Sequence, residues 1–243
     1  MSEPVWITRC GLVPYERARE VQSRLAAARQ AERIPDLLLM LEHPPVYTRG
    51  RRSQSAELPM GEAWYRAQGI EVRDTDRGGA VTYHGPGQLV GYPIVSLRAY
   101  RDDVRDYVAR MERVIVEALA EHGVKAGPMQ GLTGVWAGER KIGSIGVHVS
   151  RGVTTHGFAI NVNNDLQPFE WIVPCGIDDC RMTSLSAELG GEQDPAAFAD
   201  TVAERFASVY GRDSSPVAAD ELARRVPGTD ALAPQANLAT AVP

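Results

Sequence analysis

Three strand-like runs follow one another in the second half of the chain, and their short connections limit the folds that it can adopt. The runs cover residues 134–137, 141–149 and 153–162. The turn-forming residues Gly138-Glu139 and Ser150-Arg151-Gly152 join them. Strands joined this closely run in opposite directions, because a parallel pair needs a long crossover connection. We therefore expect an antiparallel meander in this region.

Helical patterns surround these strands. Apolar residues recur at helical spacing over residues 14–30, 102–122 and 194–211, and Gly123 ends the longest of these patterns. A short apolar run at residues 37–41, bounded by prolines, indicates a buried strand. Helices interleaved first with strands and then with hairpins predict an α/β or α+β domain. We expect a mixed β-sheet flanked by helices rather than a doubly wound parallel sheet.

Prolines and small residues mark the irregular parts of the chain. Two adjacent prolines within residues 42–50 predict an irregular corner, and Pro93 within a strand at 89–97 predicts an edge strand or a bulge. From Asp213 onward the chain is rich in alanine and proline and has no sustained period. We therefore expect residues 1–212 to form a single domain and residues 213–243 to form a disordered C-terminal tail.

The composition is that of an ordinary globular protein, with 44% hydrophobic and 23% charged residues. The formal net charge of −5 does not favour binding to nucleic acid. The N-terminus lacks a basic start followed by an apolar run, and no stretch of about 18 apolar residues occurs, so we expect a cytoplasmic protein without membrane association. Three cysteines indicate free thiols, and none forms a zinc pattern with His148 or His156, so no metal is expected.

A glycine-rich stretch, residues 77–88, lies between two strand-like runs and reads Arg-Gly-Gly-Ala-Val-Thr-Tyr-His-Gly-Pro-Gly-Gln. Glycine lacks the Cβ atom that keeps a ligand away from the backbone, so the stretch is typical of a loop that faces a ligand. A wide turn between strands explains the same composition equally well. The phosphate-binding alternative is weaker, because the spacing matches neither a P-loop nor a dinucleotide fingerprint.

Cys175 is the first candidate for chemistry. It lies between Pro174 and Gly176, a context that suits the presentation of a reactive thiol in a loop better than packing in a core. The alternative is a small buried side chain, which is the commoner fate of a single cysteine. We expect a structural role of this kind for Cys180.

Lys141 and His84 are further candidates. Lys141 begins Lys-Ile-Gly-Ser-Ile-Gly-Val-His, and the small residues Gly143, Ser144 and Gly146 clear space for a ligand beside it. The alternative is a lysine at a strand end that extends into solvent. His84 lies in the glycine-rich stretch, where a histidine hydrogen-bonded to the backbone is the simpler interpretation.

Five segments together resemble the motifs of the octanoyltransferases of lipoate assembly, in the order in which that family has them. Each segment alone is weak, but the ordered set is specific and covers roughly residues 5–211. The segments are Leu-Glu-His-Pro-Pro-Val-Tyr-Thr (41–48), the glycine-rich stretch (77–88), Lys-Ile-Gly-Ser-Ile-Gly-Val (141–147), His-Gly-Phe-Ala-Ile-Asn-Val (156–162) and Pro-Cys-Gly-Ile (174–177). Cys180 and Met182 depart modestly from the family pattern.

The resemblance implies the fold of the catalytic domains of biotin and lipoate protein ligases, with residues 1–212 as the catalytic acyltransferase domain. It implies Cys175 as the acyl-carrying nucleophile and Lys141 as its partner, and it requires no cofactor. It also implies the following walls for the acyl and lysine site: Arg77, Gly78, Gly79, Ala80, Val81, Thr82, Tyr83, His84, Ser144, Ile145, Gly146, Gly157, Phe158 and Ala159.

The implied acyl donor is octanoyl-acyl carrier protein. The implied acceptors are the lipoyl domains of 2-oxoacid dehydrogenase complexes and the glycine cleavage H protein. The arginines Arg49, Arg51 and Arg52 are either solvated loop residues or a docking patch for the acidic carrier. Two alternatives remain: an ATP-dependent lipoate or biotin protein ligase of the same fold, which needs no nucleophilic cysteine, and a non-catalytic protein that binds lipoyl domains.

Overall fold

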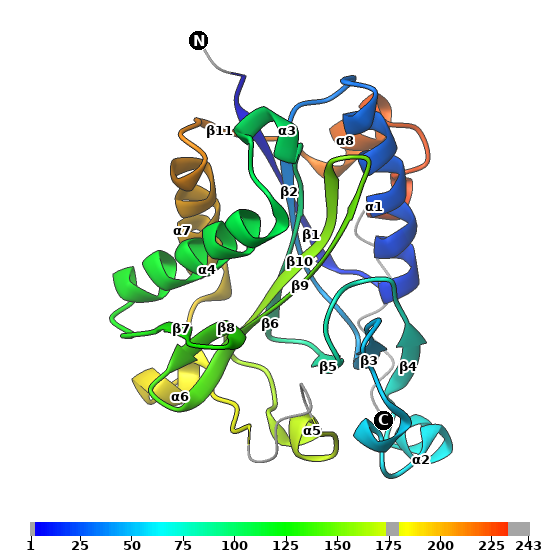
Figure 1. Cartoon of the computed structure of the whole chain (residues 1–243), viewed down its shortest axis with the longest axis vertical. Coiled ribbons are helices and arrows are strands. Elements are labelled where there is room, and N and C mark those ends of the chain that lie inside the picture. Colours follow the sequence, from blue (N-terminus) through cyan, green and yellow to red (C-terminus); the bar gives the residue numbers. More distant parts are fainter. Residues whose placement is uncertain (1–2, 174–179, 233–243) are drawn as a thin grey trace.

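The computed structural model describes residues 3–173 and 180–232 and contains an eight-stranded mixed sheet (Figure 1). In spatial order its strands are β11 (Ser214–Pro216), β1 (Val5–Leu12), β2 (Leu37–Glu42), β6 (Gln88–Ile94), β10 (Val153–Asn161), β9 (Arg140–Ser150), β8 (Leu132–Ala137) and β7 (Gly127–Met129). Strands β11, β1 and β2 are parallel, and the remaining neighbours pair in opposite directions. The predicted mixed sheet and the meander of β8, β9 and β10 are therefore confirmed.

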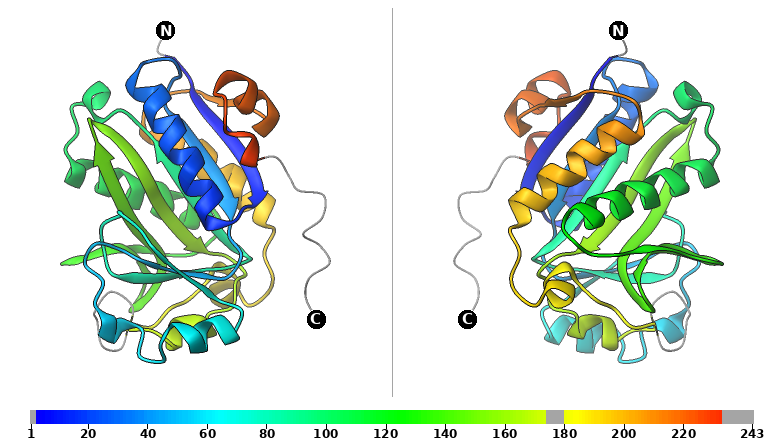
Figure 2. Two further views of the ribbon diagram at one scale, coloured as in Figure 1. Left: turned by 90° about the vertical axis from the view of Figure 1, so that its right-hand side faces the viewer. Right: turned by 90° about the vertical axis from the view of Figure 1, so that its left-hand side faces the viewer.

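Helices cover both faces of this sheet (Figure 2). On one face lie α4 (Val104–Glu121) and α7 (Pro195–Val209), and on the other lie α1 (Tyr15–Gln30) and α8 (Ala219–Arg225). Strand β2 is apolar almost throughout because both of its faces are covered: Leu38 and Met40 join the core on the α4 side, whereas Leu37 and Leu39 join the core on the α1 side. The helices predicted at residues 14–30, 102–122 and 194–211 are all present.

A second, smaller sheet contains β4 (Glu71–Asp74), β3 (Val46–Arg49) and β5 (Val81–His84). It packs against α2 (Glu62–Ala67) and α5 (Gln167–Glu170) through an aromatic cluster that includes Tyr47 and Tyr65. The prediction of an irregular corner over residues 42–50 is wrong for β3, which pairs with strands on both sides despite the prolines just before it. The shorter elements are α3 (Leu97–Tyr100), α6 (Leu185–Leu189) and 3₁₀ turns at Ser55–Glu57 and Asp230–Leu232.

Pro93 lies in β6, an interior strand between β2 and β10, so the prediction of an edge strand is wrong. The ladder between β6 and β10 extends to the pair Phe158–Gly91 and stops before Pro93. Pro93 has no N–H to donate to β10, so the ladder loses no hydrogen bond from this residue by ending before it. On β10, His156 adopts φ +58° within this break, and its N–H donates to Gln22 Oε1 at 2.6 Å.

The expected disordered tail is wrong for residues 214–232. Strand β11 pairs in parallel with β1, and α8 packs on the α1 side of the sheet. Val217, Leu222 and Val226 are buried there, but they are too few to give a visible period in the sequence. Residues 233–243 lie outside the described residues. None of the helices in the described ranges is long and apolar enough to span a bilayer.

Candidate active site

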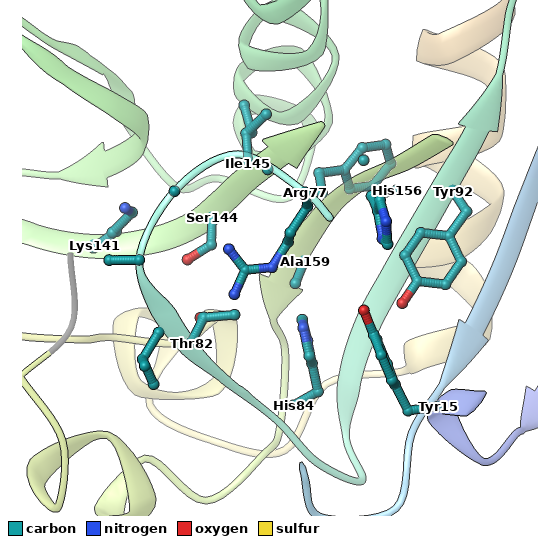
Figure 3. Close-up of a pocket in the computed structure, with 16 residues that line it drawn as sticks. Tyr15, Arg77, Thr82, His84, Tyr92, Lys141, Ser144, Ile145, His156 and Ala159 are labelled. Carbon is teal, nitrogen blue, oxygen red and sulfur yellow. The ribbon is translucent and has the colours of Figure 1, made fainter. Parts of the chain in front are cut away.

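A cavity lies between the small sheet and the centre of the large sheet, and it gathers most of the residues that the sequence indicated as walls (Figure 3). The indicated residues that line it are Arg77, Gly79, Ala80, Val81, Thr82, His84, Ser144, Ile145, Gly146, Gly157, Phe158 and Ala159, together with Lys141. Gly78 and Tyr83 do not line it. The Gly78 N–H donates to Val147 O at 2.9 Å, and Tyr83 packs against Phe169 in the core of the small sheet.

Lys141 lies on β9 with only 3% of its surface exposed, which excludes the alternative of a lysine that extends into solvent. Its N–H donates to Arg181 O at 2.8 Å, and its carbonyl accepts from Thr183 N at 2.9 Å. Its ammonium lies 5.4 Å from the centroid of the Trp136 ring. Gly134 leaves room for the side chain, because a Cβ atom at that position would lie 2.7 Å from Lys141 Cε.

The glycines of β9 serve packing more than ligand space. A Cβ atom on Gly146 would lie 3.0 Å from Gly78 O, and one on Gly143 would lie 3.3 Å from Ile115 of α4. The glycine-rich stretch therefore rests directly on β9, and the sheet rests directly on α4. Of the three small residues beside Lys141, Ser144 and Gly146 line the cavity and Gly143 does not, so the expectation of cleared space is corrected for Gly143.

Arg77 crosses the middle of the cavity (Figure 3). Its guanidinium donates to Thr48 O at 2.6 Å, to Thr48 Oγ1 at 2.8 Å and to Gly78 O at 3.0 Å. The Arg77 side chain is buried, and Gly50 permits its approach, since a Cβ atom there would lie 2.7 Å from the guanidinium. Arg77 thereby ties the glycine-rich stretch to strand β3.

Three aromatic rings line one end of the cavity: Tyr15 from the start of α1, His84 and Tyr92. His43 does not line the cavity, but its ring packs against all three. His43 Nδ1 lies 2.6 Å from Val13 O, and only a protonated nitrogen can bond to a carbonyl. His43 Nε2 therefore accepts from the Tyr92 hydroxyl at 2.7 Å. Burial lowers the pKa of His43 to about 4, so this histidine stays neutral near pH 7.

His84 is the member of this group that the sequence indicated. Gln88 donates through Nε2 to Tyr83 O and Asn161 Oδ1, which leaves Gln88 Oε1 to accept from His84 Nδ1 at 2.8 Å. The proton of His84 is therefore on Nδ1, and Nε2 carries a lone pair. Burial, with a contribution from neighbouring His43, lowers the pKa of His84 to about 3. The alternative of a bond to backbone is wrong for the Nδ1 atom.

Asp76 precedes the glycine-rich stretch and fastens it to β10. Its Oδ1 accepts from His156 Nε2 at 2.8 Å, and His148 Nε2 lies 3.6 Å from Oδ2. The hydrogen bond from His156 holds the pKa of Asp76 well below its usual range. Despite this grouping, residues 3–173 and 180–232 contain no set of three or more His, Cys, Asp or Glu side chains placed to hold a metal ion.

Tyr15, Tyr92 and His156 also line the cavity, and sequence reasoning did not assign them to the site. Tyr15 and Tyr92 occupy positions that read as the apolar faces of a helix and a strand, so no local signal separates them from core residues. His43 lies within the motif at residues 41–48, and that motif was the only pointer to it.

Cys175 lies outside the described residues, but both flanks of residues 174–179 are anchored beside the cavity. Before them, the Val173 N–H donates to Glu57 O at 3.1 Å, and the Glu57 carboxylate accepts from Val81 N at 2.9 Å. After them, Arg181 and Thr183 hold the backbone of Lys141. The chain before Cys175 is thus linked through Glu57 to Val81 of the cavity wall, and the chain after it is bonded to the buried lysine.

The three clustered arginines have different environments. Arg49 forms ion pairs with Asp74 at 2.7 Å and with Glu62 at 2.8 Å, so its charge is already compensated. Arg51 and Arg52 are exposed, and their N–H groups donate to Arg77 O and Gly79 O. These two side chains therefore project from a turn that is bonded to the cavity wall.

Known proteins with similar folds include two kinds of protein ligase. A bi-partite lipoate protein ligase from Thermoplasma acidophilum superimposes with a TM-score of 0.71 at 17% identity, covering 95% of this chain and 91% of that one. A biotin protein ligase from Aquifex aeolicus superimposes with a TM-score of 0.51 at 14% identity, covering 87% of this chain and 70% of that one. At such identities the likeness establishes the fold, as expected from the sequence.

Sequence relatives are closer. An octanoyltransferase from Solibacter usitatus is 48% identical over 206 residues, which are 85% of this chain and 91% of the relative. One from Nocardia farcinica is 44% identical over 242 residues, which are 97% of this chain and 92% of the relative. Residues 14–207 match the lipoyl protein ligase A/B catalytic domain. The chain belongs to the octanoyltransferase family of enzymes, which has this catalytic domain and acts in lipoate biosynthesis.

Proposed function

We propose that this octanoyltransferase takes the octanoyl group from octanoyl-acyl carrier protein, holds it as a thioester on Cys175, and passes it to a lysine ε-amino group of a lipoyl domain. The observation that carries the proposal is the buried side chain of Lys141, whose backbone is bonded to Arg181 and Thr183, six and eight residues after Cys175 in the chain. The acceptors would be lipoyl domains of 2-oxoacid dehydrogenase complexes and the glycine cleavage H protein.

The first half-reaction needs a thiolate. A thiol with a pKa near 8.5 is only a few per cent ionised at neutral pH, and a neighbouring ammonium raises that fraction. In the proposed step the Cys175 thiolate attacks the thioester carbonyl, the new S–C bond forms as the bond to the carrier sulfur breaks, and the leaving carrier thiolate takes the proton of the Lys141 ammonium. One thioester replaces another, so the step is nearly balanced in energy and needs no ATP.

The second half-reaction needs a base. The octanoyl-cysteine carries no charge to pair with a cation, and a neutral Lys141 amine then accepts the proton that the attacking amine loses. The acceptor N–C bond forms as the Cys175 thiolate leaves. A lysine suits both tasks because, unlike arginine, it can lose a proton in a protein. The chain contains only two lysines, Lys125 and Lys141, and Lys141 is the buried one.

Mass spectrometry after incubation with octanoyl-acyl carrier protein tests the nucleophile. We expect one octanoyl adduct on the wild type, sensitive to hydroxylamine, and none on Cys175→Ser. The matched controls are Cys10→Ser and Cys180→Ser, which should keep the adduct. Cys10 is a buried thiol whose pKa burial raises to about 12, so it is a poor nucleophile. A hydroxylamine-sensitive adduct that survives in Cys175→Ser contradicts the assignment.

The same assay separates the two alternatives. Transfer from free octanoate that depends on ATP would favour a ligase that activates the acid as an adenylate. Binding of lipoyl domains without any acyl-enzyme under turnover conditions would favour a non-catalytic binding protein.

A further inference from the structure

Strand β9 has a β-bulge beside the buried lysine. Val135 of β8 pairs with Gly143 of β9. The next residue of β8, Trp136, pairs with Lys141, which leaves Ile142 as an extra residue on β9. Ile142 joins the core under α4, and a Cβ atom on Gly143 would also contact α4. Neighbouring residues of a regular strand point to opposite faces, so the bulge reverses the alternation and turns Lys141 toward the cavity.

The pairing with Trp136 places an aromatic ring against the lysine amine. Directly paired residues of neighbouring strands project from the same face of the sheet. The Lys141 Nζ atom lies over the Trp136 ring, 5.4 Å from its centroid, which is within the range of a cation–π interaction. The ring is only 5% exposed, and Trp136 is not among the described residues that line the cavity. The indole therefore acts on the lysine and not on a ligand in the cavity.

The ionisable groups around Lys141 make this contact important. The described titratable residues that line the cavity with it are Arg77, His84, His156, Tyr15 and Tyr92, and none of these is a carboxylate. Residues 134–137 of β8 have no ionisable side chain. The segment on the other side of Lys141 adds Arg181, and Glu188 beyond it already accepts from Thr183 and Arg140. A buried ammonium needs stabilisation, and the Trp136 ring supplies some without carrying a charge.

We propose that Trp136 is a positioning residue that holds the Lys141 amine in place and favours its charged form over the neutral one. This inference rests on the proposed function, because it takes Lys141 to serve both half-reactions. A carboxylate in the same place would compete with the Cys175 thiolate for the ammonium. An aromatic ring attracts the cation more weakly and has no site for its proton, so the amine can still give that proton to the carrier thiolate.

The two half-reactions need opposite forms of the amine, so loss of the ring should change them in opposite directions. The thiolate forms beside the ammonium, so acylation of Trp136→Leu should slow about tenfold at neutral pH. The transfer step needs the neutral amine, so the low-pH limb of its rate profile should move about one pH unit lower. Trp136→Phe should lie between the two, because phenylalanine keeps a weaker aromatic face.

Single-turnover mass spectrometry measures acylation, and transfer from isolated acyl-enzyme to a lipoyl domain measures the second step as a function of pH. Ionisation of the acceptor lysine is the same for every variant, so a difference between two profiles reports a change in the enzyme. A lysine that is merely misplaced would slow both steps by similar factors at every pH. That outcome overturns the proposal, as do unchanged rates in Trp136→Leu.

Trp6→Leu is the matched control. It also removes an indole that contacts a cation, since the guanidinium carbon of Arg225 lies 4.7 Å from the centroid of the Trp6 ring. Trp6 is on β1, however, and three strands of the sheet separate β1 from β9. Both half-reactions should keep the wild-type rates and pH profiles in this variant.

A fluorinated tryptophan at position 136 decides the question even if circular dichroism shows Trp136→Leu to be misfolded. Fluorine withdraws electron density from the ring face and leaves the shape of the ring nearly unchanged, so it weakens the attraction to the cation. We expect the same two opposite changes, smaller than in Trp136→Leu, and wild-type behaviour would overturn the proposal. Failure of the proposed function would appear separately, as the absence of a Cys175 adduct on the wild type.

Discussion

A Cβ atom on Gly134 would lie 2.7 Å from Cε and 3.3 Å from Nζ of Lys141, so the side chain of the buried lysine lies against a strand position that only glycine leaves open. Backbone hydrogen bonds fix the main chain of Lys141, and the space left by Gly134 on β8 accommodates the end of its side chain. Positions that look like ordinary strand residues therefore determine where the amine lies.

Gly134→Ala should displace the Lys141 amine, both directly and by pushing on strand β9, because the added Cβ atom would also lie 2.5 Å from Gly143 O. We expect the rate of octanoyl-cysteine formation to fall about a hundredfold, because small misplacements of a catalytic group have effects of this size. Rapid-quench mass spectrometry measures the rate. Gly138→Ala is the control, since Gly138 also has a positive φ but nothing lies within 4 Å of its missing Cβ. An equal loss in both variants would indicate backbone strain instead of displacement.

Lys141→Met should impair both half-reactions, each by about 10²- to 10⁴-fold, the usual contribution of a positioned acid or base. Single-turnover acylation measures the first step, and transfer from isolated acyl-enzyme measures the second. Lys125→Met removes the chain's other lysine, which is exposed, and should leave both rates as they are. Normal acylation by Lys141→Met at neutral pH would exclude a role in forming the thiolate.

Arg51→Glu combined with Arg52→Glu should weaken docking of the acidic carrier. We expect KM for octanoyl-acyl carrier protein to rise about tenfold at low salt, since charges at the rim of an interface act mainly on association. The KM for octanoyl-pantetheine, which lacks the carrier, should stay unchanged. Arg49→Gln should have the smaller effect on the carrier, because Asp74 and Glu62 already compensate that charge. No change in KM for the carrier would place docking elsewhere.

The His43 pKa predicts a dependence of stability on pH. The unfolded chain binds a proton at this histidine below about pH 6.5, whereas the folded protein does so only near its pKa of about 4. Stability should therefore fall as the pH drops through this window, by up to about 1.4 kcal/mol per pH unit from this group. Urea unfolding at several pH values should show a shallower slope for His43→Gln than for the wild type. An unaltered slope would mean that His43 titrates normally in the folded state.

Leu222→Ala tests whether the segment after Asp213 contributes to the fold. Leu222 is fully buried, and removing a buried leucine side chain costs about 2–5 kcal/mol of unfolding free energy. Leu189→Ala is the control, because Leu189 is 40% exposed and should lose less than about 1 kcal/mol. Chemical denaturation measures both, and a loss at Leu222 as small as that at Leu189 would show that α8 adds little.

Much of the fold could be predicted from the sequence because local patterns agree with the final packing. Helix α4 has a regular apolar face and begins with a capping box. The Asp103 carboxylate accepts from the Asp106 N–H, and the Asp106 carboxylate accepts from the Asp103 N–H. The meander followed from its short turns. The sequence did not predict strand β3 or the order of residues 214–232. Contacts with residues far away in the sequence stabilise both segments, and such contacts produce no periodic apolar pattern within the segments themselves.

The site could be predicted only in part, because local composition marks some of its residues and not others. Lys141 and the glycine-rich stretch stood out because their composition is odd for a strand and a turn. Tyr15 and Tyr92 did not, because an aromatic residue on an apolar face looks the same whether its hydroxyl faces a core or a cavity. Only the three-dimensional arrangement distinguishes Tyr15 from a core tyrosine such as Tyr107.

Residues 181 and 183 hold the backbone of Lys141 through main-chain hydrogen bonds, and this has a consequence for sequence variation. Any residue except proline supplies the same N–H at position 183, and any residue supplies the same carbonyl at position 181. The side chains at positions 181 and 183 therefore do not take part in these hydrogen bonds. Cys180 and Met182 depart from the family pattern in this same segment. Substitutions at these two positions leave the main-chain hydrogen bonds that align Lys141 unchanged.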